Sequence, residues 1–352
     1  MYDAILGQPD AIARVLKEES DAVGELAQRL GGAERLHIVG IGTSLHASLV
    51  GEHLLRMVGG RDDARAWNSF EFCAYPPTLS ETDAVIVMSH RGTKRYSARA
   101  LEMAKAAGAG TAIVTGIGSE ARDDLADVVL RTCPQEKSAA FTISHTAAMA
   151  LLVMLAAEIG RATARPEAEV VAAGLARLPE LVQRALDRES EVRRWVGKVK
   201  DAERQYFVGW GPNVSTAYEA PLKIKETSYI VTEGFELEQY LHGLFSATDS
   251  RTAVTFIAPP GPGRDRVTDE IGAVKAVGGH AVALVEEDDT EVSPLVDTTI
   301  QLPETVEPLT PLVYLVPLQL FTYWLAVGRG RNPDLFRQDE ADHRVARAKY
   351  QL

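Results

Sequence analysis

Short runs of hydrophobic residues alternate along the chain with longer segments in which hydrophobic residues recur every three or four positions. The short runs predict buried β-strands, and the periodic segments predict helices that each bury one face. In the first half, strands are expected at 36–42, 83–89, 110–116 and 127–133, and helices at 46–58, 97–108, 119–125 and 138–160. Strands that alternate with helices predict an α/β fold, in which helices flank a parallel sheet.

The second half of the chain repeats this plan. Strands are expected at 205–211, 252–259, 280–287 and 297–303, and helices at 215–230, 264–278 and 309–328. Each half opens on a strand that ends in Gly-x-Gly, which indicates an internal duplication and therefore two similar open domains. The predicted division is an N-terminal helical segment 1–30, a first domain 31–164, a helical linker 165–202, a second domain 203–330 and a C-terminal tail 331–352.

The apolar segment 309–328 is long enough to cross a membrane. It contains Pro311, Pro317 and Gln319, and it stands alone near the end of the chain, so we predict a buried helix instead. The first residues contain acid and no apolar core of signal-peptide length. A cytoplasmic protein is therefore expected.

The composition narrows the range of partners and cofactors. With 49 acidic and 37 basic residues among 352, the formal charge is -12, which argues against binding to nucleic acid or to an anionic membrane. The two cysteines, Cys73 and Cys133, provide neither a disulfide framework nor a metal-binding spacing. The glycine-rich turn at 40–48 lacks the third glycine of a dinucleotide-binding fingerprint. We therefore expect no metal and no cofactor.

The loops that follow the first-domain strands carry small polar and cationic residues. A doubly wound sheet binds its ligand at the carboxyl ends of its strands, which here selects the segments 40–44 and 89–94. In Ser-His-Arg-Gly-Thr-Lys, Ser89 can donate a hydrogen bond, Gly92 lets backbone amides converge, and Arg91 and Lys94 supply charge for a phosphate. Arg95 and Arg99 are expected on the solvated face of the next helix.

Two other segments leave alternatives open. Thr43 and Ser44 present hydroxyls at an exposed helix N-terminus, which suits an anion, but a plain turn capped by Ser44 has the same pattern. Ser138 and Thr142 precede another predicted helix, either as caps or as hydroxyls that face a ligand.

The second domain contributes candidate acid–base groups. Glu219, Lys223 and Glu226 lie at i, i+4 and i+7 and so share one helical stripe, either as a surface salt-bridge ladder or as part of a site. His242 follows Glu226 by sixteen residues. A phosphate-binding loop, a carboxylate and a histidine together indicate an enzyme that moves protons on a phosphorylated small molecule.

Several motifs, in order along nearly the whole chain, resemble those of the double sugar-isomerase (SIS) domain proteins. They are ILGQPDAI at 5–12, IGTS at 41–44, SHRGT at 89–93, EAPLKIKE at 219–226, ELEQYLHG at 236–243 and the apolar segment that ends in RGRNPD at 329–334. The isomerase half of glucosamine-6-phosphate synthase and the SIS-type glucosamine-6-phosphate deaminases are the most similar. The resemblance implies two tandem flavodoxin-like SIS domains and a C-terminal tail over the active site.

The resemblance also implies roles for individual residues. The implied substrate-binding residues are Thr43, Ser44, Ser89, His90, Arg91, Thr93, Lys94 and Thr142, and the implied catalytic residues are Glu226, His242, Glu219, Lys223 and Arg347. Ser89, His90, Arg91 and Lys94 would surround the phosphate, and Glu226 would move a proton between C1 and C2 of the open-chain sugar. His242 would assist ring opening from the partner subunit of a homodimer.

The chain departs from the family pattern in four respects. The family's Ser-Gln-Ser-Gly-Glu-Thr is Ser-His-Arg-Gly-Thr-Lys here, Phe141 replaces a serine of the sugar-contacting loop, and Arg347 replaces a lysine of the tail. An arginine cannot act as a neutral amine, so any such role would need Lys349 and a shifted tail; the tail could equally be a frayed terminus. The family's glutamine-hydrolysing domain is absent from the sequence, so glutamine is not expected as nitrogen donor.

These considerations predict a phosphorylated amino sugar as the substrate. The expected reaction is isomerisation and deamination of a glucosamine 6-phosphate type sugar. Three alternatives remain: dehydration of N-acetylglucosamine 6-phosphate with loss of the C3 hydroxyl, cleavage of a ketoamine phosphate, and a sensor that binds sugar phosphates without reacting.

Overall fold

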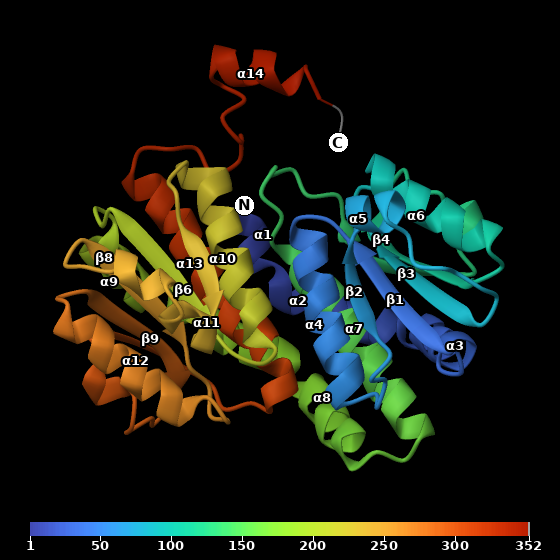
Figure 1. Cartoon of the computed structure of the whole chain (residues 1–352), viewed down its shortest axis with the longest axis horizontal. Helices are drawn as coiled ribbons and strands as arrows, with labels where there is room; N and C mark the ends of the chain where they lie inside the picture. The colour runs from blue at the N-terminus through green and yellow to red at the C-terminus, as the bar shows by residue number, and fades with distance from the viewer. Residues whose placement is uncertain (351–352) are drawn as a thin grey trace. The chain divides into compact units, whose positions relative to one another are not determined.

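A computed structural model describes residues 1–350 and contains two parallel five-stranded sheets, each flanked by helices (Figure 1). Two compact units contain one sheet each. The first-domain unit comprises residues 7–137, 141–179 and 337–350, and the second-domain unit comprises 1–6, 138–140 and 180–336. The predicted α/β class with two similar sheets is confirmed.

The first sheet contains β1 (Arg35–Gly40), β2 (Arg65–Asn68), β3 (Asp83–Met88), β4 (Gly110–Ile117) and β5 (Val128–Pro134). All neighbours are parallel, in the order β2-β1-β3-β4-β5, and Ile38 of β1 pairs with Ile86 of β3. The chain therefore crosses to opposite faces of the sheet after β1 and after β3. Such a reversal leaves a crevice at the carboxyl ends of these two strands, where doubly wound folds bind ligands.

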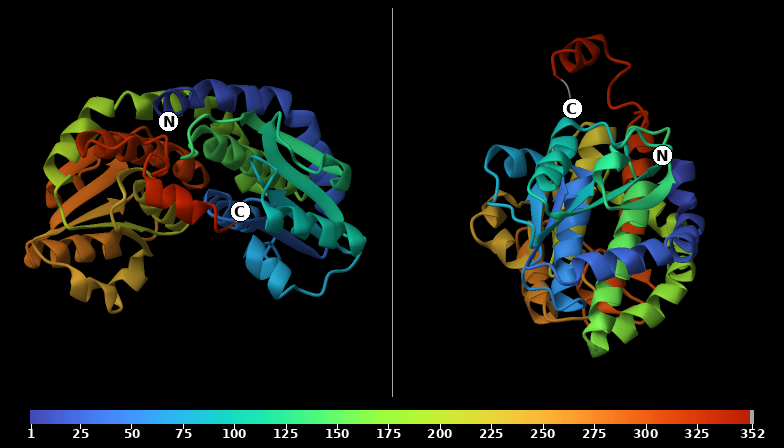
Figure 2. Two further views of the ribbon diagram at one scale, coloured as in Figure 1. Left: turned by 90° about the horizontal axis from the view of Figure 1, so that it is seen from above. Right: turned by 90° about the vertical axis from the view of Figure 1, so that its right-hand side faces the viewer.

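Helices cover both faces of this sheet (Figure 2). The first-domain unit contains α2 (Gln8–Glu18), α3 (Ser20–Leu30), α4 (Thr43–Met57), α5 (Ser69–Ala74), α6 (Arg95–Ala106) and α7 (Ile143–Ala162). The helices α4 and α7 pack together on one face, and α5 and α6 lie on the other. Gly51 permits the close approach on the α4 side, since a Cβ there would lie 3.0 Å from Leu152 and 3.2 Å from Ile38. The helix expected at 119–125 is only a 3₁₀ turn, Asp123–Leu125, which follows from its short apolar stretch.

The second sheet contains β6 (Arg204–Gly209), β7 (Glu233–Glu236), β8 (Thr252–Ile257), β9 (His280–Glu286) and β10 (Thr298–Leu302). Its order, β10-β9-β8-β6-β7, places the first strand between the second and the third, as in the first sheet. Its unit contains the helices α1 (Tyr2–Leu6), α9 (Glu189–Val199), α10 (Asn213–Ser228), α11 (Leu237–Leu241), α12 (Arg264–Ala276) and α13 (Thr310–Gly328). The predicted linker forms the two helices α8 (Pro166–Leu186) and α9. The boundary between the two units falls within α8, after Pro179.

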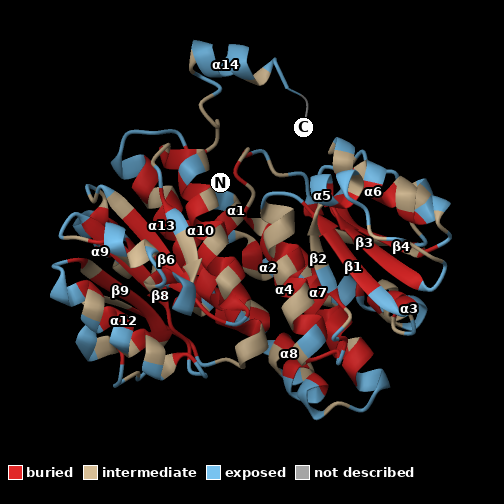
Figure 3. Ribbon diagram, in the orientation of Figure 1, coloured by how far each residue is buried: buried red, intermediate tan, exposed pale blue. Residues whose placement is uncertain are grey.

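Among residues 1–350, two helices are long and apolar enough to cross a membrane by length and composition. They are 89% (Ile143–Ala162) and 78% (Glu307–Gly328) buried inside the protein, and Figure 3 shows both α7 and α13 mostly in the buried class. Phe321 of α13 stacks on Trp195 of α9, with ring centroids 3.9 Å apart. Both are core helices, as predicted for 309–328.

The crevice position of the second sheet is filled by a side chain of the protein itself. Trp210 follows β6 and is 7% exposed. A Cβ added to Gly263 would come within 2.5 Å of the indole of Trp210, so the backbone of that loop rests directly on the ring. The two sheets share their strand order but differ at the place where such sheets bind ligands.

A carboxyl group is also buried in this domain, on α12, whose Val267 and Ile271 belong to the same hydrophobic cluster as Trp210. Glu270 of α12 is fully buried, and neither of its carboxyl oxygens has a hydrogen-bond partner within the described residues. Burial raises the pKa of Glu270 to about 8, and the nearby carboxylates of Glu238 and Glu236 act in the same direction.

Candidate functional site

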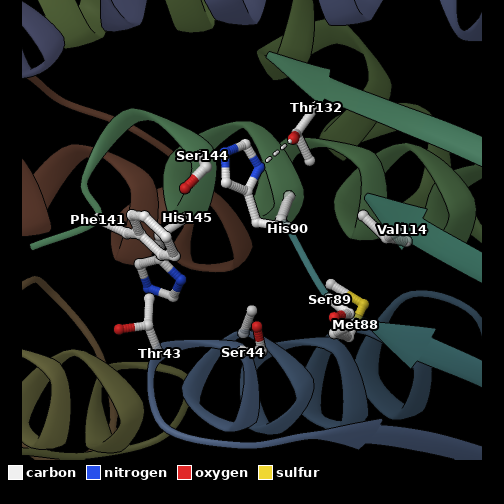
Figure 4. Close-up of a pocket in the computed structure, with 12 residues that line it drawn as sticks. Thr43, Ser44, Met88, Ser89, His90, Val114, Thr132, Phe141, Ser144 and His145 are labelled. Atoms are coloured by element: carbon white, nitrogen blue, oxygen red, sulfur yellow. Dashed lines mark hydrogen bonds between the residues drawn. The ribbon is translucent and has the colours of Figure 1, made fainter. Parts of the chain in front are cut away.

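A pocket opens at the carboxyl ends of β1 and β3, the crevice expected from the strand order (Figure 4). The residues that line it are Thr43, Ser44, Ala47, Met88, Ser89, His90, Val114, Thr132, Phe141, Ser144, His145 and Ala148. They come from the start of α4, the loop after β3, the strands β4 and β5, and the start of α7. Five of these residues were expected here from the sequence: Thr43, Ser44, Ser89, His90 and Phe141.

The loop after β3 is held in one shape by backbone hydrogen bonds. The Ser89 amide donates to the Val114 carbonyl over 2.9 Å, and the Thr115 hydroxyl donates to the Ser89 carbonyl over 2.8 Å. Gly92 has φ +76°, and a Cβ there would lie 2.3 Å from the amide nitrogen of Ala121. A glycine is therefore required, both for the turn and for the close approach of the neighbouring loop.

Ser89 carries a buried hydroxyl at the floor of the pocket. The side chain is 5% exposed, and its Oγ has no hydrogen-bond partner among residues 1–350. Buried hydroxyls are normally paired, because an unpaired one loses the hydrogen bonds it made to water. A ligand atom at this position would supply the missing partner.

Two helices start at the pocket without a side-chain cap. Gly42 is the N-cap of α4 and Lys94 that of α6, and neither residue caps its helix through a side chain. Ser44 is the second residue of α4 and faces the pocket, so the alternative in which it caps the turn is wrong. Neither first turn contains an acidic residue. No acidic residue in its first turn therefore neutralises either helix end, which leaves the positive dipole ends to favour an anion, although in α4 the amides of Ser44 and Leu45 donate to the Ile41 and Gly42 carbonyls.

The third helix end at the pocket is already capped by the protein. Glu136 accepts hydrogen bonds from the amides of Thr142 at 3.0 Å and Ser144 at 3.0 Å, and from the Ser144 hydroxyl. Thr142 is fully buried, its hydroxyl lies 3.4 Å from Glu136, and it is not among the residues that line the pocket. The start of α7 is thus neutralised from within, unlike those of α4 and α6.

Cationic side chains surround the mouth of the pocket. Arg91 is exposed and lies 4.9 Å over the ring of Phe141, whereas Lys94 is half-buried and Thr93 is exposed. Burial lowers the pKa of Lys94, and the charges of Arg91 and Arg347 lower it further. Cations that cluster at the positive end of a helix dipole repel one another and are repelled by that end of the helix. A bound anion would offset this repulsion.

Two histidines lie inside the pocket. His90 hydrogen-bonds Thr132 through Nδ1 at 3.1 Å, and its ring meets Phe141 edge-on with centroids 5.2 Å apart. His145, on the first turn of α7, is 4% exposed. Sequence reasoning missed His145 together with Thr132 and Ser144. The sequence pointed to His145 only through its position, about one helical turn after Thr142, which was expected either to cap the helix or to face a ligand.

In the second domain, the helix α10 brings Glu219, Lys223 and Glu226 together. Glu219 and Lys223 are 1% and 2% exposed. The Lys223 ammonium lies 3.5 Å from a Glu219 oxygen and 2.5 Å from a Glu226 oxygen, and Glu226 is the most exposed of the three. The alternative of a surface salt-bridge ladder is therefore wrong. Two carboxylates share one buried ammonium.

His242 lies elsewhere on this domain. Its side chain is 69% exposed and pairs with Glu238 of α11 at 3.1 Å, and Glu238 in turn binds Arg266 at 2.6 Å. The structure thus brings Glu219, Lys223 and Glu226 together, and it places His242 on the surface with a different carboxylate.

The tail forms a short helix, α14 (Ala341–Arg347), which is exposed except for a half-buried Arg347. Arg347 is close enough to Lys94 to lower its pKa, so the tail approaches the mouth of the first-domain pocket. Lys349 is exposed. Within residues 1–350, no three His, Cys, Asp or Glu side chains lie together in a way that could hold a metal ion.

Comparison with known proteins identifies the family. The SIS domain matches residues 30–158 and 198–329. Glutamine–fructose-6-phosphate aminotransferases (isomerizing) of Methanothermobacter thermautotrophicus and Pyrococcus horikoshii are each 31% identical over 95% of this chain. The match covers 55% and 56% of those proteins, so the chain spans about half the length of the relatives it matches.

Solved structures share the fold at lower identity. The C-terminal domain of glucosamine-fructose-6-phosphate aminotransferase from Francisella tularensis superposes with a TM-score of 0.84, at 20% identity over 95% of this chain and 97% of that one. Glucosamine-6-phosphate deaminase from Thermotoga maritima gives 0.71, at 19% identity over 94% and 96%. The matched segments and the strand order of both sheets lead to one conclusion: this chain belongs to the SIS domain family, with one SIS domain in each half.

Proposed function

We propose that the protein is a phosphosugar isomerase that converts an amino-sugar 6-phosphate, of the glucosamine 6-phosphate type, into a ketose phosphate and ammonia. The observation that carries the proposal is the buried group of Glu219, Lys223 and Glu226. Burying the charges of Glu219 and Lys223, with Glu226 partly covered beside them, is costly for folding, and a hydrophobic stripe would pack as well. A protein that only senses sugar phosphates has no need of them.

The phosphate of the substrate would bind at the first-domain pocket. The Ser89 hydroxyl would donate to one oxygen, the starts of α4 and α6 would face the anion, and Arg91 and Lys94 would add charge at the mouth. Thr43 and Ser44 would contact the adjoining sugar atoms. In this role the anion relieves the repulsion among the cations described above.

Glu226 would move the proton. In the open-chain amino aldose, its carboxylate takes the hydrogen from C2, and the electron pair of that bond forms the C1–C2 double bond. The displaced π pair of the C1 carbonyl moves to O1, which takes up a proton from solvent to give an enolamine. Return of the proton to C1 gives a C2 imine, to which water adds, and ammonia leaves to give fructose 6-phosphate. Lys223 would keep Glu226 ionised, and Glu219 would hold Lys223 in place.

The remaining partners follow from the same proposal. The exposed His242 would assist ring opening from the partner subunit of a homodimer, and Arg347 would approach the bound phosphosugar with the tail. We propose a cytoplasmic enzyme without a cofactor, a metal, nucleic acid or a membrane partner.

One observation favours a second reaction. Phe141 lines the pocket and packs against both His90 and Arg91, which makes this wall apolar where the family has a serine. An apolar wall suits the methyl group of an N-acetylated substrate. With the nitrogen acetylated, the same enol intermediate can expel the C3 hydroxyl as water, which would make the protein a dehydratase of N-acetylglucosamine 6-phosphate.

The proposal is tested by a proton NMR time course in deuterated buffer. Glucosamine 6-phosphate and N-acetylglucosamine 6-phosphate are supplied separately to the wild type, to Glu226→Gln and to the control Glu233→Gln, which changes an exposed glutamate of β7. Fructose 6-phosphate with deuterium at C1, formed by the wild type and the control but not by Glu226→Gln, is the expected result.

Other outcomes decide between the alternatives. Loss of the C3 hydroxyl from the acetylated sugar would replace the deaminase by the dehydratase. Unchanged spectra with both sugars, together with a raised melting temperature, would refute the enzyme and favour the sensor. A ketoamine phosphate cleaved under the same conditions would identify a deglycase.

A further inference from the structure

The ring of His90 is fixed from several sides. Its Nδ1 lies 3.1 Å from the Thr132 hydroxyl, and the edge of the ring contacts Phe141. Below the ring, a Cβ added to Gly116 would lie 2.6 Å from Cε1 and 2.8 Å from Nδ1. The His90 carbonyl accepts bonds from the Gly116 amide at 2.9 Å and from Gln135 at 3.1 Å. The ring therefore has one orientation in this pocket.

A count of the hydrogen atoms around the ring assigns its tautomer. The Thr132 hydroxyl has a single hydrogen. Its oxygen lies 3.2 Å from the Thr115 carbonyl oxygen, to which it donates that hydrogen. The Thr115 hydroxyl donates in turn to the Ser89 carbonyl. If Nδ1 of His90 carries the hydrogen, it donates to Thr132, and each of these three donors has an acceptor.

The other tautomer leaves a buried donor unsatisfied. Nε2 of His90 is buried without a hydrogen-bond partner in the described chain, so an N–H at that position would have lost water and gained nothing. Figure 4 shows the side chain of Ser144 beside this edge of the ring, but the hydrogen of its hydroxyl is donated to Glu136. No hydrogen bond joins the Ser144 oxygen to Nε2, so Ser144 does not accept an N–H at that position either.

The imidazole is neutral under ordinary conditions. Burial and, to a smaller extent, the neighbouring charge of Arg91 together lower the pKa of His90 to about 4. The ring is 8% exposed, so water does not compensate for a charge on it.

We propose that His90 is a fixed hydrogen-bond acceptor of the pocket, in which Thr132 holds the hydrogen on Nδ1 and Nε2 accepts an O–H or N–H of the sugar rather than contacting an ionised phosphate oxygen. This inference rests on the proposed phosphosugar substrate and deepens it. An unprotonated nitrogen repels an anionic oxygen, so the phosphate belongs on the side of Ser89, Arg91 and Lys94. His90 then becomes a residue that selects for a sugar and against a bare anion, whereas the family resemblance had implied a phosphate contact.

The tautomer is tested first, in the free protein. The whole chain is labelled with ¹⁵N-histidine, and long-range proton–nitrogen correlation spectra are recorded at neutral pH. The His90 signals are assigned by their loss in His90→Gln, among the eight histidines of the chain. We expect a pyrrole-type Nδ1 and a pyridine-type Nε2. A pyrrole-type Nε2, or a protonated ring, would overturn the assignment, and neither result depends on any ligand.

The ligand role is tested by comparing two probes in Glu226→Gln, which prevents turnover. Glucosamine 6-phosphate should shift the Nε2 resonance while it stays pyridine-type, and inorganic phosphate at pH 8 should leave it unchanged. A pyrrole-type Nε2 after addition of inorganic phosphate would overturn the proposal. If glucosamine 6-phosphate does not bind at all, both the proposed function and the proposed sugar contact are refuted. The tautomer assignment is tested independently by the spectra of the free protein.

Two variants of Thr132 separate this role from a structural one. Thr132→Val removes the hydroxyl that fixes the tautomer, and we expect affinity for glucosamine 6-phosphate to fall about fivefold to tenfold, the loss of one hydrogen bond. Affinity for inorganic phosphate should not change, and Thr132→Ser should behave like the wild type. Equal losses for both probes would show that Thr132 only supports the fold of the loop.

Discussion

The buried carboxyl of Glu270 predicts how the second domain responds to alkaline pH. The groups that influence it are Arg266, which lowers its pKa, and Glu238, Glu236 and Asp269, which raise it. Desolvation is the largest effect, and it favours the protonated form up to about pH 8. In the unfolded chain the same carboxyl has its ordinary pKa of 4.5.

The sign of the effect follows from the protons bound in each state. Between pH 4.5 and about pH 8, the folded state keeps a proton on Glu270 that the unfolded state has released. Stability therefore falls as the pH rises through this window, and the fall ends above the folded pKa. Between pH 6 and pH 9 the loss from this one group is about 2 to 3 kcal/mol. Glu270→Gln, which resembles the neutral acid in shape, should abolish it.

The assay is urea denaturation at pH 6, 7.5 and 9, followed by tryptophan fluorescence. Three of the four tryptophans, Trp195, Trp210 and Trp324, lie in the second-domain unit and report on it. The substitution itself can shift the free energy of unfolding by an amount that does not depend on pH. Once that constant difference is subtracted, wild type and Glu270→Gln should be equally stable at pH 6, and the variant should be the more stable at pH 9. Asp265→Asn, which changes an exposed residue of α12 that is not among the groups acting on Glu270, is the control and should follow the wild type. Parallel pH profiles for wild type and Glu270→Gln would refute the reasoning.

Three further predictions concern the site and its supports. Lys223→Met removes the ammonium that pairs with the buried Glu219 and the partly buried Glu226, so urea denaturation should show a loss of about 3 to 5 kcal/mol; a neutral effect would contradict the role of this charge group. Gly92→Ala forces a Cβ against Ala121 and should abolish binding of glucosamine 6-phosphate by calorimetry, whereas the control Gly24→Ala, in open space on α3, should add about 0.5 to 1 kcal/mol of stability. Glu136→Gln weakens the cap of α7 and should cost about 1 kcal/mol in the same denaturation assay, less at high salt; an unchanged midpoint would show that the carboxylate is dispensable.

The part of the site that lies at strand ends could be predicted from the sequence. Hydrophobic periodicity locates the strands, and parallel strands bring their carboxyl ends to one edge whatever the details of packing. Ser89, Thr43 and Ser44 were therefore expected at the pocket before any contact was known. Their positions follow from chain topology alone.

The burial of the α10 charges could not be predicted in the same way. A spacing of i, i+4 and i+7 is identical for a solvated ladder and for a buried group. The choice depends on what covers the helix, and here α13, more than eighty residues later in the chain, packs against α10. The partners of His90 and of the start of α7 are equally distant: Thr132 lies forty-two residues after His90 and comes from another strand. Pairings of this kind are set by the tertiary fold.

The indole of Trp210 has a consequence for the origin of the two halves. Both sheets have the same strand order, as expected of copies that descend from one ancestral domain, yet one copy keeps an open crevice and the other has closed it with an aromatic ring. In the second half the loop that carries Gly263 rests on that ring, whereas in the first half the loops after β1 and β3 line a pocket. The two halves therefore share their strand order but differ in the side chains at the carboxyl ends of their strands. The symmetry of the fold does not extend to the residues that could bind a ligand there.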